Sequence, residues 1–306
     1  MALHKNDIIG KKYRIINKIG SGSFGDVYKG KNVRTGELVA IKVESLSSNS
    51  QLLKGEARIA RFISNHKGFA AVKWYGVDTE NTYAVFELLG SSLDIYMSRL
   101  GKFSLRTTLL LGIQMIERLQ VLHENGIIHR DIKPDNFMLG HSNPDTLYMI
   151  DFGLAKCYLR EGQHIPPKEK RKITGTIRYA SLNLHEGYEP SRRDDLISVG
   201  YMMIYFLKGK LPWQGLNAST KEERHQMIWD VKQDTPLKDL CDGLPDALMD
   251  YMRDCYRLGF TDKPEYTRLI YGLKNVLKKV YLEHEKIIFD WSIEDSNTIY
   301  LIDFCY

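Results

Sequence analysis

The sequence has few cysteines and no long hydrophobic run. Four cysteines are spread over 306 residues without any C-x-x-C pair, which favours reduced structural thiols in a cytoplasmic or nuclear protein. The most apolar stretch, residues 199–207, is much shorter than a membrane span and is expected to form a helix buried on all faces. The first fifteen residues contain no apolar core of signal-peptide length. We therefore expect an intracellular, soluble protein with no membrane span.

The sequence also has little excess of charge of either sign. Its 43 Lys and Arg residues and 38 Asp and Glu residues give a net charge of +5, and basic and aromatic residues are not interleaved. Both observations argue against nucleic acid as a partner. With 43% hydrophobic and 26% charged residues, the composition excludes disorder over most of the length. The length suffices for two lobes or for one large domain.

The hydrophobic pattern changes along the chain. Apolar positions alternate over residues 13–43, 72–77 and 82–88, which predicts strands, whereas residues 51–63 fit a helix. Ser104 is predicted to cap a long helix that ends at Gly126, and from Asp194 onward nearly all segments fit helices. We therefore expect an α+β protein with a small β-rich lobe over 1–89, a larger helical lobe over 90–291 and a tail over 292–306.

A glycine-rich segment, "IGSGSFGDVYKG", supplies the G-x-G-x-x-G pattern at Gly20, Gly22 and Gly25. In a dinucleotide-binding fold a helix would follow the third glycine, but here the next residues alternate like a β-hairpin. No Gly-Lys pair is followed by Ser or Thr, which argues against a Walker loop. The pattern favours a hairpin whose backbone amides cover phosphate groups, over the alternative of a structural turn.

Lys42 lies inside a predicted strand, in the segment "VAIK". A buried lysine requires an anionic partner, and Glu56 on the next predicted helix is the candidate. Such a pair can present the ammonium group to the α- and β-phosphates of a nucleotide. The alternative is a surface lysine and an unrelated glutamate.

The segment "IIHRDIKPDNFML" holds many charges between apolar residues, and "DFG" follows at 151–153. Asn136 and Asp151 provide oxygen atoms of the kind that Mg²⁺ binds together with phosphates and water. Asp131 then remains to accept the proton of an attacking hydroxyl, and Lys133 can steady the transferring phosphoryl group. Together with the glycine loop and "VAIK", these motifs resemble the protein-kinase signature.

The resemblance extends to one kinase family. The segments "LLGSSLD", "HIPPKEKRKITGTIRYASLN", "SRRDDLISVGYMMIYFLKGKLPWQGL" and "FDW" are similar to the casein kinase 1 family over about residues 13–291. The most telling segment is "RYASLN" at 178–183, where most kinases carry an A-P-E ending. The resemblance implies a bilobal protein-kinase fold and an ATP- and Mg²⁺-dependent serine/threonine protein kinase. It implies catalytic roles for Lys42, Glu56, Asp131, Lys133, Asn136 and Asp151, of which Asn136 and Asp151 would bind the metal.

The resemblance also implies a set of ATP contacts. Phe86 would be the gatekeeper, where the family more often has methionine, so the usual back pocket is in doubt. Glu87 and Leu89 would bind adenine through their backbone, and ordinary core packing is the alternative for the apolar members. The full set comprises Ile19, Gly20, Ser21, Gly22, Ser23, Phe24, Gly25, Val27, Ala40, Lys42, Phe86, Glu87, Leu89 and Met138.

Substrate preference is also implied by the resemblance. Lys133 and Thr176 are similar to serine/threonine kinases, and the family favours acidic or already phosphorylated protein substrates. Its anion site corresponds to Arg178 and Gly215, with Lys221 and Arg224 as cations that share one helix face. In the alternative interpretation these helix charges are only solvated. The loss of basic charge after "LPWQGL" predicts a weaker preference for phosphorylated substrates.

A second basic set consists of Arg130, Lys156 and Arg171. Many kinases use an arginine before the catalytic aspartate to hold a phosphorylated activation loop. The family tends to be active without that phosphate, so we expect a dephosphorylated sample to be active. In the alternative, Lys156 and Arg171 only face solvent.

Three rival functions remain open at the level of sequence. A pseudokinase or scaffold would share the fold but lack the complete catalytic set. A small-molecule or lipid kinase would not need the segments that resemble a peptide-docking platform. A nucleic-acid binder is disfavoured by charge. We expect a monomer in the cytoplasm, the nucleus or both, and a tail that packs on the helical lobe or meets a partner.

Overall fold

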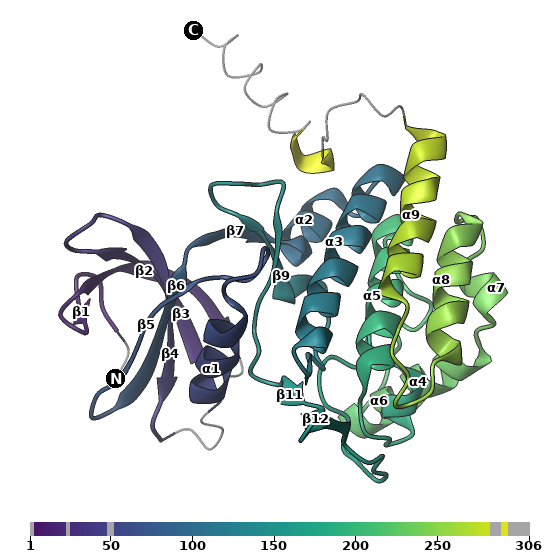
Figure 1. Cartoon of the computed structure of the whole chain (residues 1–306), viewed down its shortest axis with the longest axis horizontal. Coiled ribbons are helices and arrows are strands. Elements are labelled where there is room, and N and C mark those ends of the chain that lie inside the picture. Colours follow the sequence, from purple (N-terminus) through teal and green to yellow (C-terminus); the bar gives the residue numbers. More distant parts are fainter. Residues whose placement is uncertain (1–2, 23–24, 48–51, 282–288, 293–306) are drawn as a thin grey trace, which may run out of the picture. The chain divides into compact units, whose positions relative to one another are not determined.

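The computed structural model describes residues 3–22, 25–47, 52–281 and 289–292. The chain divides into two compact units, one formed by Met1–Ser91 and Met138–Ala155, the other by Ser92–Phe137 and Lys156–Tyr306. The first is rich in strands and the second in helices, which confirms the predicted α+β composition (Figure 1). The exact lobe limits expected from the sequence stay a prediction.

The first unit contains a six-stranded antiparallel sheet in the order β1-β2-β3-β4-β6-β5. Its strands are β1 (Ile8–Ile9), β2 (Tyr13–Gly22), β3 (Gly25–Asn32), β4 (Leu38–Ser45), β5 (Val72–Val77) and β6 (Asn81–Glu87). Helix α1 (Leu53–Ile63) packs against β4, β5 and β6. The strands and the helix lie close to where the sequence pattern predicted them.

The two faces of this sheet carry different side chains because successive residues of a strand point to opposite sides. Ile41 and Val43 belong to a buried cluster on one face, together with Val85 of β6. The opposite face contributes Ala84 and Phe86, which pack against Leu53 and Ala57 of α1. Lys42 alternates with Ile41 and Val43 and is paired in register with Ala84. Its side chain therefore lies on the face that α1 covers.

A smaller sheet has the order β10-β9-β7. Its strands are β7 (Leu89–Ser92), β9 (Phe137–Gly140) and β10 (Leu147–Met149). Strands β7 and β9 approach closely at Gly90, where a Cβ atom would lie 3.2 Å from the carbonyl oxygen of Leu139. This sheet brings Leu89 and Met138 into the same unit as Lys42.

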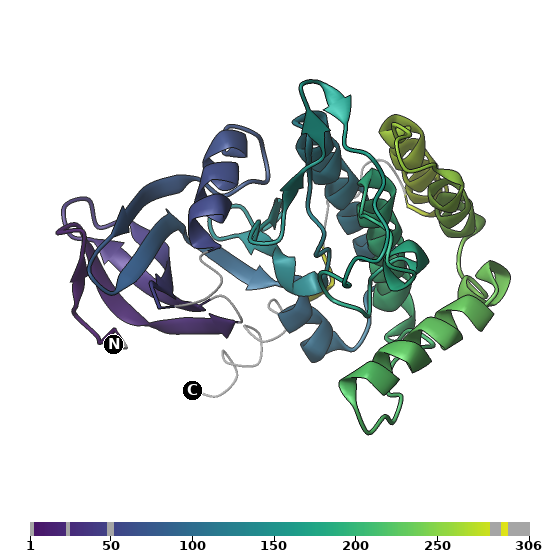
Figure 2. The ribbon, with the colours of Figure 1, turned by 90° about the horizontal axis from the view of Figure 1, so that it is seen from below.

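The second unit has α3 and α5 at its core. Helix α3 packs against α5 and α9, and α5 packs against α8, which lies beside α9 (Figure 2). The helices are α2 (Leu93–Leu100), α3 (Leu105–Glu124), α4 (Leu182–His185), α5 (Arg192–Lys208), α6 (Lys221–Asp234), α7 (Leu237–Leu240), α8 (Asp246–Arg257) and α9 (Tyr266–Val280). Residues 199–204 of α5 are all buried, which confirms the predicted buried helix.

The long helix α3 confirms its predicted cap. Ser104 is the N-cap and accepts a hydrogen bond from the Thr107 backbone, while Gly126 follows the last turn with a φ of +77°. The Asp290 carboxylate accepts two further hydrogen bonds from Ser104, one from its backbone N–H at 2.7 Å and one from its hydroxyl at 2.6 Å. Phe289 and Trp291, both buried, stack beside it. These contacts anchor the segment 289–292 at the start of α3.

Short elements complete the second unit. They are β8 (Ile127–Ile128) paired with β11 (Lys156–Cys157), β12 (Leu159–Arg160) paired with β13 (Gln163–His164), and the 3-10 turn η1 (Pro134–Asn136). None of the helices that the structure describes could cross a bilayer. The prediction that the tail 292–306 packs on the helical lobe lies outside the described residues beyond Ser292.

Candidate active site

The glycine-rich segment forms the β2–β3 hairpin that the sequence predicted. Strand register pairs Ser21 with Asp26 and Gly22 with Gly25, and Ser21 donates to the Asp26 carboxylate at 2.8 Å. Gly25 has a φ of +129°, and a Cβ atom there would overlap the carbonyl oxygen of Val43. Only glycine therefore fits this position. The predicted contacts Ser23 and Phe24 lie outside the described residues.

Lys42 forms the predicted ion pair with Glu56. Its Nζ lies 2.6 Å from Glu56 Oε2 and 3.1 Å from Asp151 Oδ1. Burial lowers the pKa of Lys42, but the two carboxylates outweigh this and hold the pKa above its ordinary value. The ammonium group therefore stays charged and fixed in the first unit, where it can bind a phosphate group.

Glu44 explains how α1 comes to hold Glu56 in place. No side chain within α1 caps its start. Instead, the buried Glu44 carboxylate of β4 accepts hydrogen bonds from the backbone of Leu52 at 3.0 Å and Leu53 at 2.9 Å. Negative charge at a helix N-terminus is favourable. Sequence reasoning missed this residue, because its partner lies eight residues away in the chain.

The other predicted nucleotide contacts also lie in the first unit. Val27 pairs with Lys42 across β3 and β4, and Phe86 pairs with Ala40 across β4 and β6. Glu87 accepts a hydrogen bond from the Ala71 backbone at 3.0 Å through its carboxylate. Each of the remaining contacts has its place in this unit: Ile19 and Gly20 on β2, Leu89 on β7 and Met138 on β9. The whole described set is therefore carried by one compact unit.

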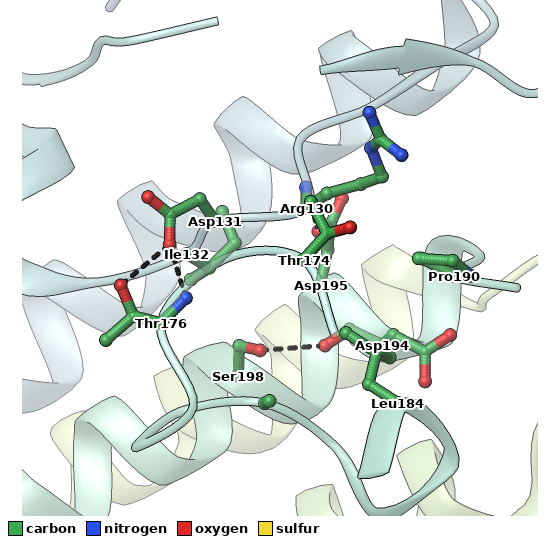
Figure 3. Close-up of a pocket in the computed structure, with 11 residues that line it drawn as sticks. Arg130, Asp131, Ile132, Thr174, Thr176, Leu184, Pro190, Asp194, Asp195 and Ser198 are labelled. Atoms are coloured by element: carbon green, nitrogen blue, oxygen red, sulfur yellow. Dashed lines mark hydrogen bonds between the residues drawn. The ribbon is translucent and has the colours of Figure 1, made fainter. Parts of the chain in front are cut away.

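Asp131 is the centre of a hydrogen-bonded group in the second unit. Its Oδ1 accepts bonds from the backbone N–H and the hydroxyl of Thr176, both at 2.8 Å (Figure 3). Its Oδ2 lies 2.8 Å from Lys133 Nζ and accepts a longer bond from the Asn136 amide. The carboxylate is 6% exposed. One oxygen is thus fixed by Thr176, while the other lies beside a cation.

The backbone is strained at two positions, one in each unit. Arg130 and Asp151 have φ values of +70° and +62°, in the left-handed region that non-glycine residues rarely adopt. Such strain persists only where the surrounding structure compensates for it, and it is common at functional sites. Arg130 directly precedes the predicted catalytic Asp131, and Asp151 is itself a predicted metal ligand, so the strain supports a functional assignment.

Asp195 holds the strained turn at Arg130 in place. It accepts bonds from the backbone of His129 at 2.7 Å and of Arg130 at 2.9 Å, and His123 Nε2 lies 3.0 Å from it. Burial would raise the pKa of Asp195, but these bonds outweigh it and lower the pKa below its ordinary value. His123 Nδ1 contacts the Tyr266 hydroxyl at 2.7 Å. A charged Asp195 therefore positions the turn that leads into Asp131.

The region around Arg130, Asp131 and Asp195 is tightly packed. The residues drawn in Figure 3 line a cavity of about 10 Å³, which is room for no more than a single water. In this view the Ser198 hydroxyl oxygen lies 3.0 Å from the Asp194 carbonyl oxygen. This cavity is too small for a substrate and lies in the packed layer beside Asp131.

The second basic set surrounds a buried carboxylate that sequence reasoning missed. Glu189 is 1% exposed, and its oxygens lie 2.5 Å from Lys156 Nζ and 3.4 Å from Arg171 Nε. Burial lowers the pKa of Arg130, and the charge of Glu189 opposes this effect. The alternative that Lys156 and Arg171 only face solvent is therefore wrong, since both bind an internal carboxylate.

The predicted anion-site residues lie on two elements of the second unit. Arg178 stacks over the ring of Tyr179, and its backbone carbonyl accepts a bond from Trp213. Lys221 and Arg224 are exposed in the first turn of α6, and neither has a carboxylate partner among the residues that the structure describes. Gly215, with a φ of +76°, precedes α6. Within the part of the chain that the structure describes, no hydrogen bond or ring contact joins Arg178 to these cations, so their shared site stays a prediction.

The predicted metal ligands suit Mg²⁺ in chemistry. The Asn136 amide nitrogen donates to the Asp131 backbone at 2.8 Å, so its carbonyl oxygen is the atom left for a metal. Asp151 adds a carboxylate. Within the described ranges, no group of three or more His, Cys, Asp or Glu residues could bind a metal alone. Each side chain offers one oxygen of the kind that Mg²⁺ binds together with phosphate and water. Asn136 belongs to the second unit and Asp151 to the first, so their joint binding of a metal stays a prediction.

The sequence match agrees with this geometry. The family model of the protein kinase domain matches residues 13–272, which is most of the chain. The matched range includes the glycine hairpin, the Lys42–Glu56 pair and the Asp131 group, and the curled sheet and helical unit fit a bilobal protein-kinase fold. The chain belongs to the protein kinase family.

Proposed function

We propose that the chain is a serine/threonine protein kinase of casein kinase 1 type, which transfers the γ-phosphate of ATP to serine and threonine hydroxyls. The observation that carries the proposal is the Asp131 group, in which one carboxylate binds both Thr176 and Lys133. A lysine two residues after the aspartate, together with this threonine, resembles kinases that act on aliphatic hydroxyls. The complete set favours an active kinase over the alternative, a catalytically weak pseudokinase or scaffold.

Asp131 would act as the proton acceptor. Thr176 fixes Oδ1, so Oδ2 is the oxygen that can accept the proton of a substrate hydroxyl. Lys133 lies 2.8 Å from Oδ2, where its charge would stabilise the negative charge that develops on the transferring group. Proton acceptor and stabilising cation therefore belong to one preorganised turn.

Nucleotide binding would be the task of the first unit. The Lys42 ammonium would bind the α- and β-phosphates, held by Glu56. The β2–β3 hairpin would cover the phosphates with its backbone, and Phe86, Glu87 and Leu89 would border adenine. Asp151 of this unit and Asn136 of the second unit would each offer an oxygen to Mg²⁺, which supplies neutralisation of phosphate charge when bound.

The substrates would be proteins with acidic or already phosphorylated sites. Arg178, Lys221 and Arg224 would supply the positive charge for an upstream anion. Glu222 and Glu223 lie in the same turn of α6, and Glu223 accepts a bond from the Ser219 backbone. They lower the local positive charge, so a phosphorylated substrate would be favoured only modestly. We also propose that the protein is a monomer and acts in the cytoplasm, the nucleus or both.

A peptide library incubated with Mg-ATP tests the proposal, because it reports the accepting residue and the upstream preference together. We expect phosphate on serine and threonine, more often where acidic residues precede them. The Asp131→Asn variant provides the background. Phosphate on tyrosine alone, or equal signals from both proteins, would contradict the proposal.

The preference for phosphorylated sites is tested with one peptide in two forms. The expected ratio of kcat/KM between the phosphorylated and unphosphorylated forms is below about tenfold, since a charge-assisted contact between exposed groups contributes about 1 kcal/mol. A ratio of a hundred or more would contradict weak selectivity.

A further inference from the structure

Lys232 is a buried lysine that the catalytic group does not use. It lies near the end of α6, is 4% exposed, and has no carboxylate partner among the residues that the structure describes. Burial lowers its pKa well below the ordinary value of a lysine. An unpaired buried cation costs free energy unless its hydrogen bonds are satisfied, so this position requires an explanation.

All three N–H groups of the Lys232 ammonium have an acceptor. They reach the Ile177 carbonyl at 2.9 Å, the Ala180 carbonyl at 2.6 Å and His185 Nε2 at 3.3 Å. Burial and the charge of Lys232 lower the pKa of His185 to about 3, so its ring stays neutral and can accept. The rings of Tyr201 and Trp213 lie 5.2 and 5.0 Å from Nζ. The surroundings therefore fit a charged lysine.

Lys232 belongs to a set of side chains that bind every backbone carbonyl of residues 177–180. Lys232 binds the first and last of these carbonyls. Trp213 Nε1 donates to the Arg178 carbonyl at 2.7 Å, and the Ser198 hydroxyl donates to the Tyr179 carbonyl at 2.7 Å. A segment held at four consecutive carbonyls has little freedom to move. Thr176, which binds Asp131, lies directly before it.

Lys232 also connects this segment to α6. Ile228 and Lys232 are the buried residues of α6 and, being four apart, share one face of the helix. Lys221 begins the same helix, about 16 Å away along its axis at 1.5 Å per residue. The bonds of Lys232 therefore tie the loop that carries Arg178 to the helix that carries Lys221 and Arg224.

We propose that Lys232 is a positioning residue for the protein substrate, which fixes Arg178 and its neighbours against α6. The inference rests on the proposed function, because it assigns this loop and helix to peptide binding. The hydrogen bonds and ring contacts of Lys232 go to residues of the second unit, whereas the predicted nucleotide contacts belong to the first. Its loss should therefore weaken the use of peptide and spare the use of ATP.

The test compares Lys232→Met with two control variants. Lys238→Met removes an exposed lysine of α7, and Leu273→Val loosens the buried helical core without touching the loop. For each protein we would measure kcat and KM for an acidic peptide, KM for ATP, ATP hydrolysis without peptide, and the thermal unfolding midpoint. The peptide-to-ATP comparison separates positioning from a general loss of stability.

For Lys232→Met we expect kcat/KM for the peptide to fall at least about tenfold. We expect KM for ATP and peptide-independent hydrolysis to stay within about twofold of the unmodified chain. Unchanged peptide kinetics would overturn the inference, as would an equal fall in peptide transfer and ATP hydrolysis like that of a destabilised core variant.

A second variant keeps the inference testable if Lys232→Met does not fold. Trp213→Phe removes only the N–H that binds the Arg178 carbonyl and keeps an aromatic ring. We expect the same selective loss toward peptide, of smaller size, and its absence would overturn the inference. An unmodified chain that transfers no phosphate to any peptide would overturn the proposed function as well. If the unmodified chain is active and Lys232→Met uses the peptide equally well, the inference about Lys232 is overturned and the proposed function stands.

Discussion

Charged side chains inside this protein are each held by several partners. Lys42 has two carboxylates, Asp195 has two backbone amides and a histidine, and Lys232 has three acceptors. Burying a charge is costly, and only a complete set of bonds offsets the cost. Removing one partner should therefore change activity or stability strongly at these positions and only slightly at exposed charges.

The Lys42–Glu56 pair gives the first prediction at this scale. In Glu56→Gln, Lys42 keeps Asp151 but loses its bond at 2.6 Å to a charged group. Hydrogen bonds to charged groups contribute about 1.5–3 kcal/mol, which corresponds to a fall of roughly 10- to 100-fold in kcat/KM for ATP. Steady-state kinetics with varied ATP checks this.

The matched control for that variant is Glu37→Gln. Glu37 pairs with Lys73 at 2.7 Å, but both side chains are partly exposed. Exposed pairs contribute little, so its kcat/KM should stay within about twofold of the unmodified chain. An equally small effect of Glu56→Gln would show that the buried pair does not position Lys42 for ATP.

His123 gives a prediction of pH dependence. Burial lowers its pKa, and Asp195 offsets this only in part, so His123 stays neutral in the folded chain. Below about pH 6.5 the unfolded chain binds a proton here that the folded chain does not, so the free energy of unfolding falls as the pH falls. His185, with a pKa lowered to about 3, acts in the same direction. Each contributes up to about 1.4 kcal/mol per pH unit.

Denaturant unfolding at pH 7.5, 6.5 and 5.5 checks this dependence. The slope below pH 6.5 should be smaller in His123→Gln, whereas His66→Gln, at an exposed position, should leave it unchanged. Asp195 does not contribute in this range, since its own loss of stability begins below about pH 4. An identical slope in His123→Gln would mean that this histidine is not the titrating group.

At the scale of elements, the segment between β13 and α5 is held by internal contacts. Glu189 binds Lys156 and Arg171, and Lys232 binds the carbonyls of Ile177 and Ala180. In many kinases a phosphate on this segment binds such cations. Here a buried carboxylate takes that place, so the segment should be ordered without phosphorylation.

This arrangement predicts that a phosphatase-treated sample is active and that Glu189 is the reason. In Glu189→Gln, the half-buried Lys156 and the more exposed Arg171 both lose the charge of their carboxylate partner. We expect kcat to fall by at least about tenfold, while the dephosphorylated unmodified chain retains its rate. Peptide kinetics before and after phosphatase treatment check both statements. Loss of activity after phosphatase treatment would contradict this role of Glu189.

The sequence predicted the elements whose signals are local. Ser104 and Gly126 mark the ends of α3, and the alternation around Lys42 marks β4. The two-residue strands β8, β11, β12 and β13 were not predicted, because two residues are too few to show a period. These short strands exist only through their pairing in the folded chain.

In the candidate site, too, the sequence predicted the residues that belong to local motifs and missed those whose partners are remote in the chain. The Lys42–Glu56 pair follows from motifs with known spacing, whereas Glu44, Glu189 and Lys232 were missed. Each of these three acts on backbone or charges that are distant in the chain, and no single-sequence pattern records such pairings. A weak signal existed for Asp194 and Asp195, since two carboxylates begin a helix that is otherwise buried.

At the scale of the whole molecule, the proposed function assigns different tasks to the two units. The first holds the ion pair and the residues assigned to the nucleotide, and the second holds Asp131 and the residues assigned to the peptide. This separation predicts that variants divide into two groups. Changes in the first unit should affect the use of ATP, and changes around Lys232 should affect the use of peptide.

The most direct test of the account is the rate of phosphate transfer from Mg-ATP to a serine peptide by Asp131→Asn. Asparagine retains the oxygen that Thr176 binds but cannot accept the substrate proton. We predict a fall of about 10²- to 10⁴-fold in kcat, with an unchanged thermal shift on addition of nucleotide. A variant that binds nucleotide and still transfers phosphate at the rate of the unmodified chain would contradict the role of Asp131.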